Sequence, residues 1–160
     1  MKTNSELVKL FTQESMGISL PNSPNKMSKE EVRFIVRMVF SEMAELCATV
    51  TNSMVDCKNL LEDCLENIDP PKIKNLSEEQ LIAEQFDSFV DAWYYMLNCA
   101  CKKGVDLDGI FQVVHQANMN KRFPDGLFHK REDGKILKPD NWKEADIVSE
   151  IRRQTCTYKD

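Results

Sequence analysis

The stretch SKEEVRFIVRMVFSEMAELCA, residues 28–48, decides the fold, because its apolar residues repeat at helical spacing. Ser28 and Glu31 have the spacing of a capping box, which marks the start of a helix. The pattern continues to Ala48, and the TVTNS that follows is rich in poor helix formers. The stretch therefore predicts one long helix, around which the rest of the chain is expected to pack.

Two glutamates lie inside the apolar sector of this predicted helix. At about 100° per residue, Glu45 falls about 60° from Glu42. The same sector holds four apolar side chains: Ile35, Met38, Val39 and Leu46. An ionised carboxylate in such a setting is costly unless it is paired or bound to a cation. The pair is expected to meet an Arg or Lys from another helix, to lie at the rim of a bundle, or to bind a metal ion.

Further helices are predicted along the chain, and no segment has the alternation of a strand. The additional helices are expected at about 4–15, 54–68, 77–103, 106–122 and 143–155. The loop residues Pro124, Gly126, Gly134 and Pro139 interrupt the segment between the last two. We therefore expect an all-α protein with a four-helix bundle core. It is expected to form a single domain over residues 1–160, with a core at about 28–122 and a basic loop, short helix and tail at 123–160.

A second predicted helix carries three acids on one stripe. Glu84, Asp87 and Asp91 fall within about 60° of one another, away from the aromatic side of the helix. Taken alone, this is the acidic outer face of an amphipathic helix. No Lys or Arg lies between residues 79 and 101 to relieve the repulsion. If the two acidic helices pack antiparallel, their carboxylates could converge on a hard cation, Mg²⁺ or alternatively Mn²⁺.

The segment from residue 121 to 143 is basic, although the chain as a whole carries a net charge of -5. Asn118 and Lys121, three residues apart, could hold phosphate groups, one as a hydrogen-bond donor and one as a point charge. A solvated tail is the alternative. Trp142 is expected to be a packing anchor for the last helix, or otherwise a residue that stacks on a base.

Composition restricts the class of partner. The negative net charge disfavours binding to a nucleic-acid polymer, and no apolar run reaches the roughly 20 residues of a membrane span. The N-terminus lacks the apolar region of a signal peptide, so we expect a cytoplasmic protein. The six cysteines form no CxxC pair, which favours reduced thiols over a zinc site.

Four segments together resemble a known family, the MazG-like, all-α nucleoside triphosphate pyrophosphohydrolases. They are SEMAE (41–45), EQFDSFVDAWYY (84–95), GVDLDGIFQVVHQANMNK (104–121) and DGKILKPDNWKEADI (133–147). The last two resemble a subgroup in which N-x-x-K is followed by D-G-K-x-x-K-P. The resemblance covers roughly residues 28–147.

This resemblance implies a homodimer or homotetramer that binds Mg²⁺ through an ExxE and an ExxD pair. The ExxE pair corresponds to Glu42 and Glu45. The ExxD pair corresponds by letter to Glu84 and Asp87, whereas the position of the N-x-x-K segment favours Asp87 and Asp91. Both assignments stay open, so the implied metal ligands are all five acids. Glu42, Glu45 and Glu84 are the implied catalytic carboxylates.

The implied reaction cleaves a (d)NTP between its α and β phosphates to give a (d)NMP and pyrophosphate, as in nucleotide-pool housekeeping. Asn118, Lys121, Lys135 and Lys138 would hold the phosphates. The sequence departs from the family at Ser41, where relatives often have an acid, and in the long interval from Glu45 to Glu84, which implies an extra hairpin at 54–76. The alternatives are a catalytically inactive nucleotide-binding or interaction module of the same fold, and a purely structural adaptor.

Overall fold

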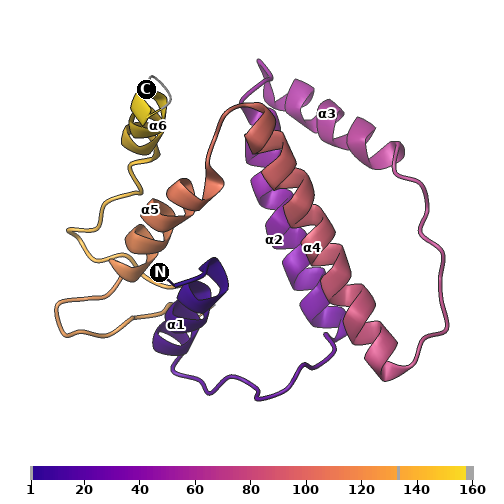
Figure 1. The fold of residues 1–160 in the computed structure, drawn as a ribbon, viewed down its shortest axis with the longest axis horizontal. Coiled ribbons are helices and arrows are strands. Elements are labelled where there is room, and N and C mark those ends of the chain that lie inside the picture. Colours follow the sequence, from indigo (N-terminus) through magenta and orange to yellow (C-terminus); the bar gives the residue numbers. More distant parts are fainter. Residues whose placement is uncertain (1, 133, 158–160) are drawn as a thin grey trace. The chain divides into compact units, whose positions relative to one another are not determined.

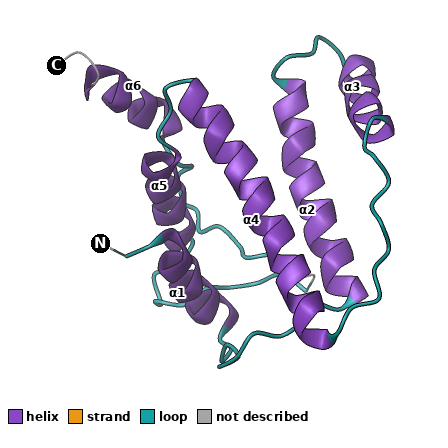
Figure 2. Cartoon of the chain, turned by 45° about the vertical axis from the view of Figure 1, so that its right-hand side comes forward, coloured by secondary structure: helices purple, strands orange, loops and turns teal. Residues whose placement is uncertain are grey.

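The structure is a computed structural model that describes residues 2–132 and 134–157 (Figure 1). Its described residues form helices α1 (Asn4–Met16), α2 (Lys29–Ala48), α3 (Met54–Glu66), α4 (Glu78–Lys102), α5 (Leu107–Met119) and α6 (Ile147–Thr157). Over the same residues there is no strand (Figure 2), only an isolated bridge between Lys130 and Ile136. The all-α prediction is therefore confirmed. Asp133, the first residue of the D-G-K segment, lies outside the described residues.

Helix starts follow the capping residues in the sequence. The Ser28 hydroxyl accepts from the Glu31 N–H, and the Glu31 carboxylate accepts from the Ser28 N–H, which completes the predicted capping box of α2. The last helix begins later than the predicted residue 143. Asp146 accepts from the Ser149 N–H through its side chain, so it caps α6 and fixes the start at Ile147.

The chain divides into two compact units, which are described separately. The middle unit is Ser23–Phe89 and contains α2, α3 and the first half of α4. The terminal unit joins Met1–Asn22 to Val90–Asp160 and contains α1, the second half of α4, α5 and α6. The expectation of one domain over the whole chain stays a prediction. None of the described helices combines the length and apolarity that crossing a membrane requires.

In the middle unit, α2 and the first half of α4 run parallel, with their N-termini at the same end (Figures 1 and 2). The Gln85 side chain accepts from the Met27 N–H at 2.7 Å and donates to the Met27 carbonyl at 3.1 Å. Lys26 also pairs with Glu78 at 3.0 Å. These contacts join the start of α4 to the start of α2, so the antiparallel packing considered from the sequence does not occur within this unit.

The segment between α3 and α4 explains the parallel direction. The Cys57 thiol donates to the Ala44 carbonyl at 3.5 Å, which places the start of α3 against the last part of α2. Residues 67–77 then form a strand-free connection containing Pro70 and Pro71. An extended chain of this length spans up to about 36 Å, whereas α2 is about 30 Å long. The connection can therefore return the chain to the start of α2 before α4 begins.

In the terminal unit, α5 packs between α1 and α6. Asn4 donates to Asp108 at 2.7 Å, Arg122 pairs with Glu14, and the rings of Phe11 and Phe128 meet edge to face at 5.6 Å. On the other side, Gln154 of α6 forms two 2.9 Å hydrogen bonds with the backbone of Asp106 at the start of α5. These contacts hold α1 and α6 on either side of α5.

A glycine permits the close packing of α5 on α6. Gly109 lies inside α5, and a β-carbon there would overlap Oε1 of Glu150 and lie 3.2 Å from Nε2 of Gln154. Glu150 is buried and accepts two hydrogen bonds from Arg153, at 2.8 and 2.7 Å, and one from Gln154 at 2.9 Å. The missing side chain at Gly109 therefore makes room for a buried carboxylate network.

We predict that Gly109→Ala destabilises the protein. A Gly→Ala change inside a helix ordinarily raises the free energy of unfolding by about 0.5–1 kcal/mol. Here the added methyl group would overpack against Glu150, which is expected to cost about 1–3 kcal/mol and so to lower the free energy of unfolding. Urea unfolding of the wild type and the variant measures the difference. In a Glu150→Ala background the cost should largely disappear, because the overlapping atom is gone. An equal loss in both backgrounds would contradict this packing.

The Glu150 network also predicts a pH dependence. Hydrogen bonds from Arg153 and then Gln154 lower the pKa of Glu150 from its ordinary 4.5 to about 2. A lowered pKa in the folded state means that the carboxylate stabilises the fold above about pH 4.5, and that this contribution is lost as the pH falls toward 2. The difference in Tm between the wild type and Glu150→Gln should be constant near neutral pH and should shrink across this interval. A Tm difference that does not change with pH would contradict the lowered pKa of Glu150.

Candidate functional site

Three of the predicted phosphate-binding residues come together around the end of α5. The Lys121 ammonium donates to Oδ1 of Asn118 at 2.7 Å. The ammonium groups of Lys121 and Lys138 lie 5.9 and 3.9 Å from the centre of the Trp142 ring. The loop is therefore folded back onto the helix that carries the N-x-x-K residues.

The electrostatics of this cluster favour an anion. Burial lowers the pKa of Lys121, and the positive charges of Lys138 and Lys135 lower it further. All four predicted phosphate-binding residues, Lys135 included, therefore act in one local field. An anionic phosphate would relieve the repulsion between the lysines and accept their hydrogen bonds. We call Asn118, Lys121, Lys135 and Lys138 the lysine cluster.

Trp142 anchors the loop to α5. Its indole N–H donates to the carbonyl of Ala117 at 2.7 Å, and so satisfies a carbonyl in the last turn of the helix. Ala117 is the one buried hydrophobic residue among those that the structure describes. This contact agrees with the packing role considered for Trp142. Base stacking by Trp142 stays a prediction, and the ring also lines a cavity beside it.

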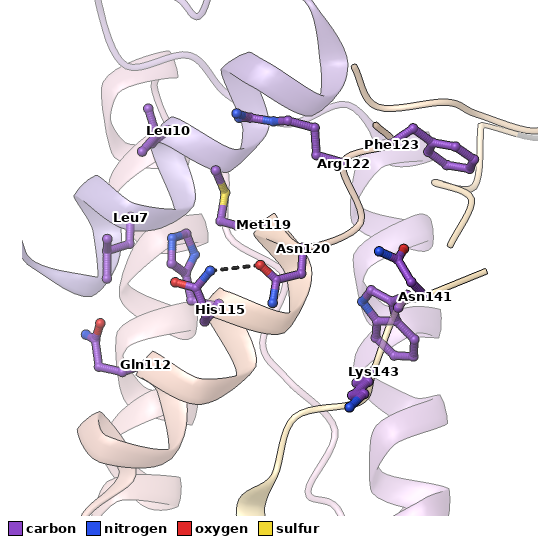
Figure 3. A pocket seen from close by; sticks show the side chains of 12 residues that line it. Leu7, Leu10, Gln112, His115, Met119, Asn120, Arg122, Phe123, Asn141 and Lys143 are labelled. Atoms are coloured by element: carbon purple, nitrogen blue, oxygen red, sulfur yellow. Dashed lines mark hydrogen bonds between the residues drawn. The ribbon is translucent and has the colours of Figure 1, made fainter. Parts of the chain in front are cut away.

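This cavity has a volume of about 780 Å³ and lies within the terminal unit, between α1, α5 and the segment that follows the basic loop (Figure 3). Leu7 and Leu10 face it from α1, whereas His115 and Asn120 belong to the α5 side, as Figure 3 shows. The segment after the loop contributes Asn141, Trp142 and Lys143. The volume falls in the range of sites for small organic ligands.

The predicted acidic residues are exposed. Glu42 and Glu45 of α2, and Asp87 and Asp91 of α4, lie on the surface. Among the described residues, no hydrogen bond or ion pair to a side chain involves any of these four carboxylates. Their apolar neighbours are exposed as well: Leu46 is 60% exposed and Met38 40%. Glu42 and Glu45 therefore lie on a largely apolar face of α2 that is not covered within the middle unit.

Glu84 differs from the other acids because it already has a cationic partner. The Lys74 ammonium donates to both carboxylate oxygens of Glu84, each at 2.8 Å. Lys74 lies outside the interval from residue 79 to 101 in which no basic residue was found. The connection between α3 and α4 supplies it. This ion pair leaves Glu84 less available to a metal ion than Asp87 or Asp91.

The chemistry of the remaining donors fits Mg²⁺. The ExxE pair supplies carboxylate oxygens from one helix face, and these are the ligands that hard divalent cations prefer. However, over residues 2–132 and 134–157 no group of three or more His, Cys, Asp or Glu side chains is arranged to hold a metal ion. The predicted set of five metal ligands is therefore not assembled within one chain in this structure, and its assignment stays a prediction.

Sequence reasoning did not identify Lys74 or the cavity. Lys74 lies in a short KIKN segment (72–75) that follows two prolines and has no periodicity, so only the return of the chain beside α4 places it near Glu84. The cavity joins α1 to α5, which are about a hundred residues apart in the sequence. Of the residues that line the cavity, the sequence analysis had singled out Trp142, which follows the D-G-K-x-x-K-P segment, as a possible base-stacking residue.

Comparison with known proteins identifies the fold and the family. The chain matches the crystal structure of "a putative NTP pyrophosphohydrolase" from Exiguobacterium sp. 255-15 with a TM-score of 0.81 and 22% identity, over 98% of each chain, which shows a shared fold. No curated protein matches the chain. The sequence profile described as phosphoribosyl-ATP pyrophosphohydrolase matches residues 11–118. The chain therefore belongs to the phosphoribosyl-ATP pyrophosphohydrolase family, the MazG-like NTP pyrophosphohydrolases.

Proposed function

We propose that the protein is a Mg²⁺-dependent nucleoside triphosphate pyrophosphohydrolase that converts a (d)NTP to a (d)NMP and pyrophosphate, in nucleotide-pool housekeeping. The observation that carries the proposal is the lysine cluster, in which Lys121 and Lys138 share the Trp142 ring and Lys121 is held by Asn118. Family membership supplies the reaction class. The proposed enzyme acts in the cytoplasm as a homodimer or homotetramer.

The lysine cluster would hold the phosphate chain of the substrate. Its ammonium groups donate hydrogen bonds to phosphate oxygens and stabilise the negative charge that pyrophosphate carries as it leaves. The cavity beside Trp142 would receive the nucleoside, because that residue borders both the cavity and the cluster. Amide side chains in the cavity, such as Gln112 and Asn141, offer hydrogen bonds to a base or a sugar.

The carboxylates would perform the proton transfer. A water molecule attacks the α-phosphorus, the bond between this phosphorus and the oxygen bridging to the β-phosphate breaks, and a carboxylate accepts the proton of the water. Glu42 is the better candidate for this base, because both oxygens of Glu84 already accept hydrogen bonds from Lys74. Glu45, Asp87 and Asp91 would then be the residues that hold Mg²⁺, and the ion would neutralise phosphate charge and activate water.

A second candidate function is nucleotide binding without turnover. The Ser41 hydroxyl, at the position where relatives often have an acid, donates to the Met38 carbonyl of its own helix at 2.7 Å. A neutral hydroxyl bonded in this way is a much weaker base than a carboxylate, and it brings no negative charge to a metal ion. Tight nucleotide binding with no release of pyrophosphate under any metal condition would favour this alternative.

We predict that Asp91→Asn lowers kcat for pyrophosphate release by at least about 100-fold, whereas Glu84→Gln has a much smaller effect. Loss of residues that merely orient metal ligands already costs about 10–100-fold, and Glu84 is paired with Lys74. The measurement is pyrophosphate release from a panel of nucleotides with and without Mg²⁺. Glu79→Gln, an exposed acid of the same helix, is the matched control. Equal losses for the Asp91 and Glu79 variants would contradict the assignment.

We predict that Lys121→Met weakens the binding of pyrophosphate about 10- to 100-fold. A hydrogen bond from a charged group contributes about 1.5–3 kcal/mol, and 1.4 kcal/mol is a factor of ten. Titration calorimetry measures the affinity. Lys103→Met removes an exposed lysine of the same unit and should leave the affinity nearly unchanged. If both variants lose the same affinity, general charge and not the cluster binds the anion.

A further inference from the structure

A chain of hydrogen bonds joins the first residue of α1 to the wall of the cavity that α5 forms. Asn4 donates from its amide nitrogen to Oδ1 of Asp108 at 2.7 Å, and Gln112 donates from its own amide nitrogen to Oδ1 of Asn4 at 3.5 Å. Asp108 and Gln112 lie one turn apart on α5, so Asn4 reaches both from the neighbouring helix. All three residues belong to the terminal unit.

The carboxylate at the end of this chain of hydrogen bonds fixes the orientation of both amides. An ionised carboxylate only accepts hydrogen bonds, so Asn4 must turn its NH2 group, and not its oxygen, toward Asp108. The Asn4 oxygen is then the atom that accepts, so Gln112 must turn its NH2 group toward Asn4. We call Asp108, Asn4 and Gln112 the amide relay. The relay uses the nitrogen of Gln112 and leaves its carbonyl oxygen for another donor.

The carbonyl oxygen of Gln112 is accessible beside the cavity. Gln112 is half-buried and lines the cavity, and Figure 3 shows its side chain below Leu7, where α1 and α5 meet. No described residue donates a hydrogen bond to this oxygen. Among the described residues that are not exposed, Ser15 Oγ is the only fully buried side-chain N or O atom without a partner. The Gln112 oxygen is therefore not sealed off, and an N–H group of a ligand can reach it.

The rest of the cavity suits a flat ring whose edge is polar. Leu7 and Leu10 supply apolar surface from α1, and Met119 and Trp142 supply it from the other walls. The Trp142 ring also lies against the ammonium group of Lys138 in the lysine cluster. A nucleotide whose phosphates are held by the cluster would therefore place its base in this cavity, with the edge of the base toward the polar side chains.

We propose that Gln112, oriented by the amide relay, makes the cavity selective for a nucleobase with an amino group over the corresponding base with a keto group. The inference rests on the proposed function and deepens it, because it names the class of nucleotide that the site takes. The exocyclic group extends farthest from the ring, so it is the part of the base that meets a side chain on the wall. An amino group donates to the Gln112 oxygen, whereas a keto oxygen in its place would repel it.

The relay gives α1 a part in this selectivity. The family profile matches residues 11–118, so Asn4 lies outside the matched region, although Gln112 lies inside it. The capping box of Thr3 and Glu6 fixes Asn4 as the first residue of α1. Helix α1 therefore supplies the atom that orients a side chain of α5, in addition to the apolar surface that it adds to the cavity.

Pairs of nucleotides with equal charge test the proposal. The pairs are CTP with UTP and ATP with ITP, each also as the deoxyribonucleotide, and titration calorimetry in EDTA measures their affinities without Mg²⁺-dependent turnover. In at least one pair the amino base should bind about 10- to 100-fold more tightly, because the keto base leaves the Gln112 oxygen without a donor. The pair that shows the preference identifies a pyrimidine or a purine site. Keto bases that bind as tightly as their amino counterparts in both pairs would overturn the proposal.

Variants of Gln112 assign the preference to its oxygen. Gln112→Leu should bring the ratio of the two affinities close to one, whereas Gln112→Glu, whose oxygens only accept, should keep the preference. Gln112→Lys offers only donors and should favour the keto base. Each ratio compares two ligands of equal charge, so the charge introduced at this position affects both alike. A preference that survives in Gln112→Leu would overturn the proposal.

Asp108→Asn tests the relay itself. An amide at this position donates as well as accepts, so it no longer dictates how Asn4 and Gln112 are turned, and the preference should fall several-fold. Thr3→Ala is the matched control, because it removes the N-cap of α1 without touching the relay. This control should lower the Tm and leave the ratio unchanged. An unchanged ratio in Asp108→Asn, or an equal fall in both variants, would refute the relay.

The binding ratios separate this proposal from the proposed function. If the amino base is preferred but no pyrophosphate is released with Mg²⁺, the selectivity stands and the hydrolase assignment fails. If pyrophosphate is released but kcat/KM and affinity are equal for the two members of each pair, the hydrolase assignment stands and the selectivity fails.

Discussion

The carboxylates of Glu42 and Glu45 lie on an apolar helix face with no cationic partner among the described residues, and they are the constraint on which the rest of the structure depends. A buried charge must be compensated, so this surface can be covered only if a cation enters together with whatever covers it. In the middle unit most of this face is exposed, the two acids together with Met38 and Leu46, although Ile35 is half-buried. Whatever covers the face would therefore have to compensate the two carboxylates as well as bury the apolar side chains.

In the terminal unit it is a positive charge, that of Lys121, that needs compensation. Lys121 is partly buried beside two other lysines, and within the described structure Asn118 supplies a neutral oxygen to it. Trp142 keeps the loop lysines near the helix by capping a carbonyl of α5 and lying beside Lys138.

The helices could be predicted from the sequence because their start signals are local. The capping box of Ser28 and Glu31 spans only four consecutive residues, yet it specifies where α2 begins, and its two hydrogen bonds form in the structure. The contact between Asn118 and Lys121 could be anticipated because the two residues are only three positions apart in the sequence. The direction of α4 relative to α2 could not, since it depends on how far residues 67–77 extend, and no periodicity records that length. Without the direction, the Lys74–Glu84 pair does not follow from the pattern.

The Lys74–Glu84 ion pair divides the acids of the candidate site into two kinds. Both oxygens of Glu84 accept hydrogen bonds from Lys74, so this carboxylate is compensated within the middle unit. Among the described residues, Glu42, Glu45 and Asp87 have no such partner, and a bound cation would bring them the positive charge that Lys74 gives to Glu84.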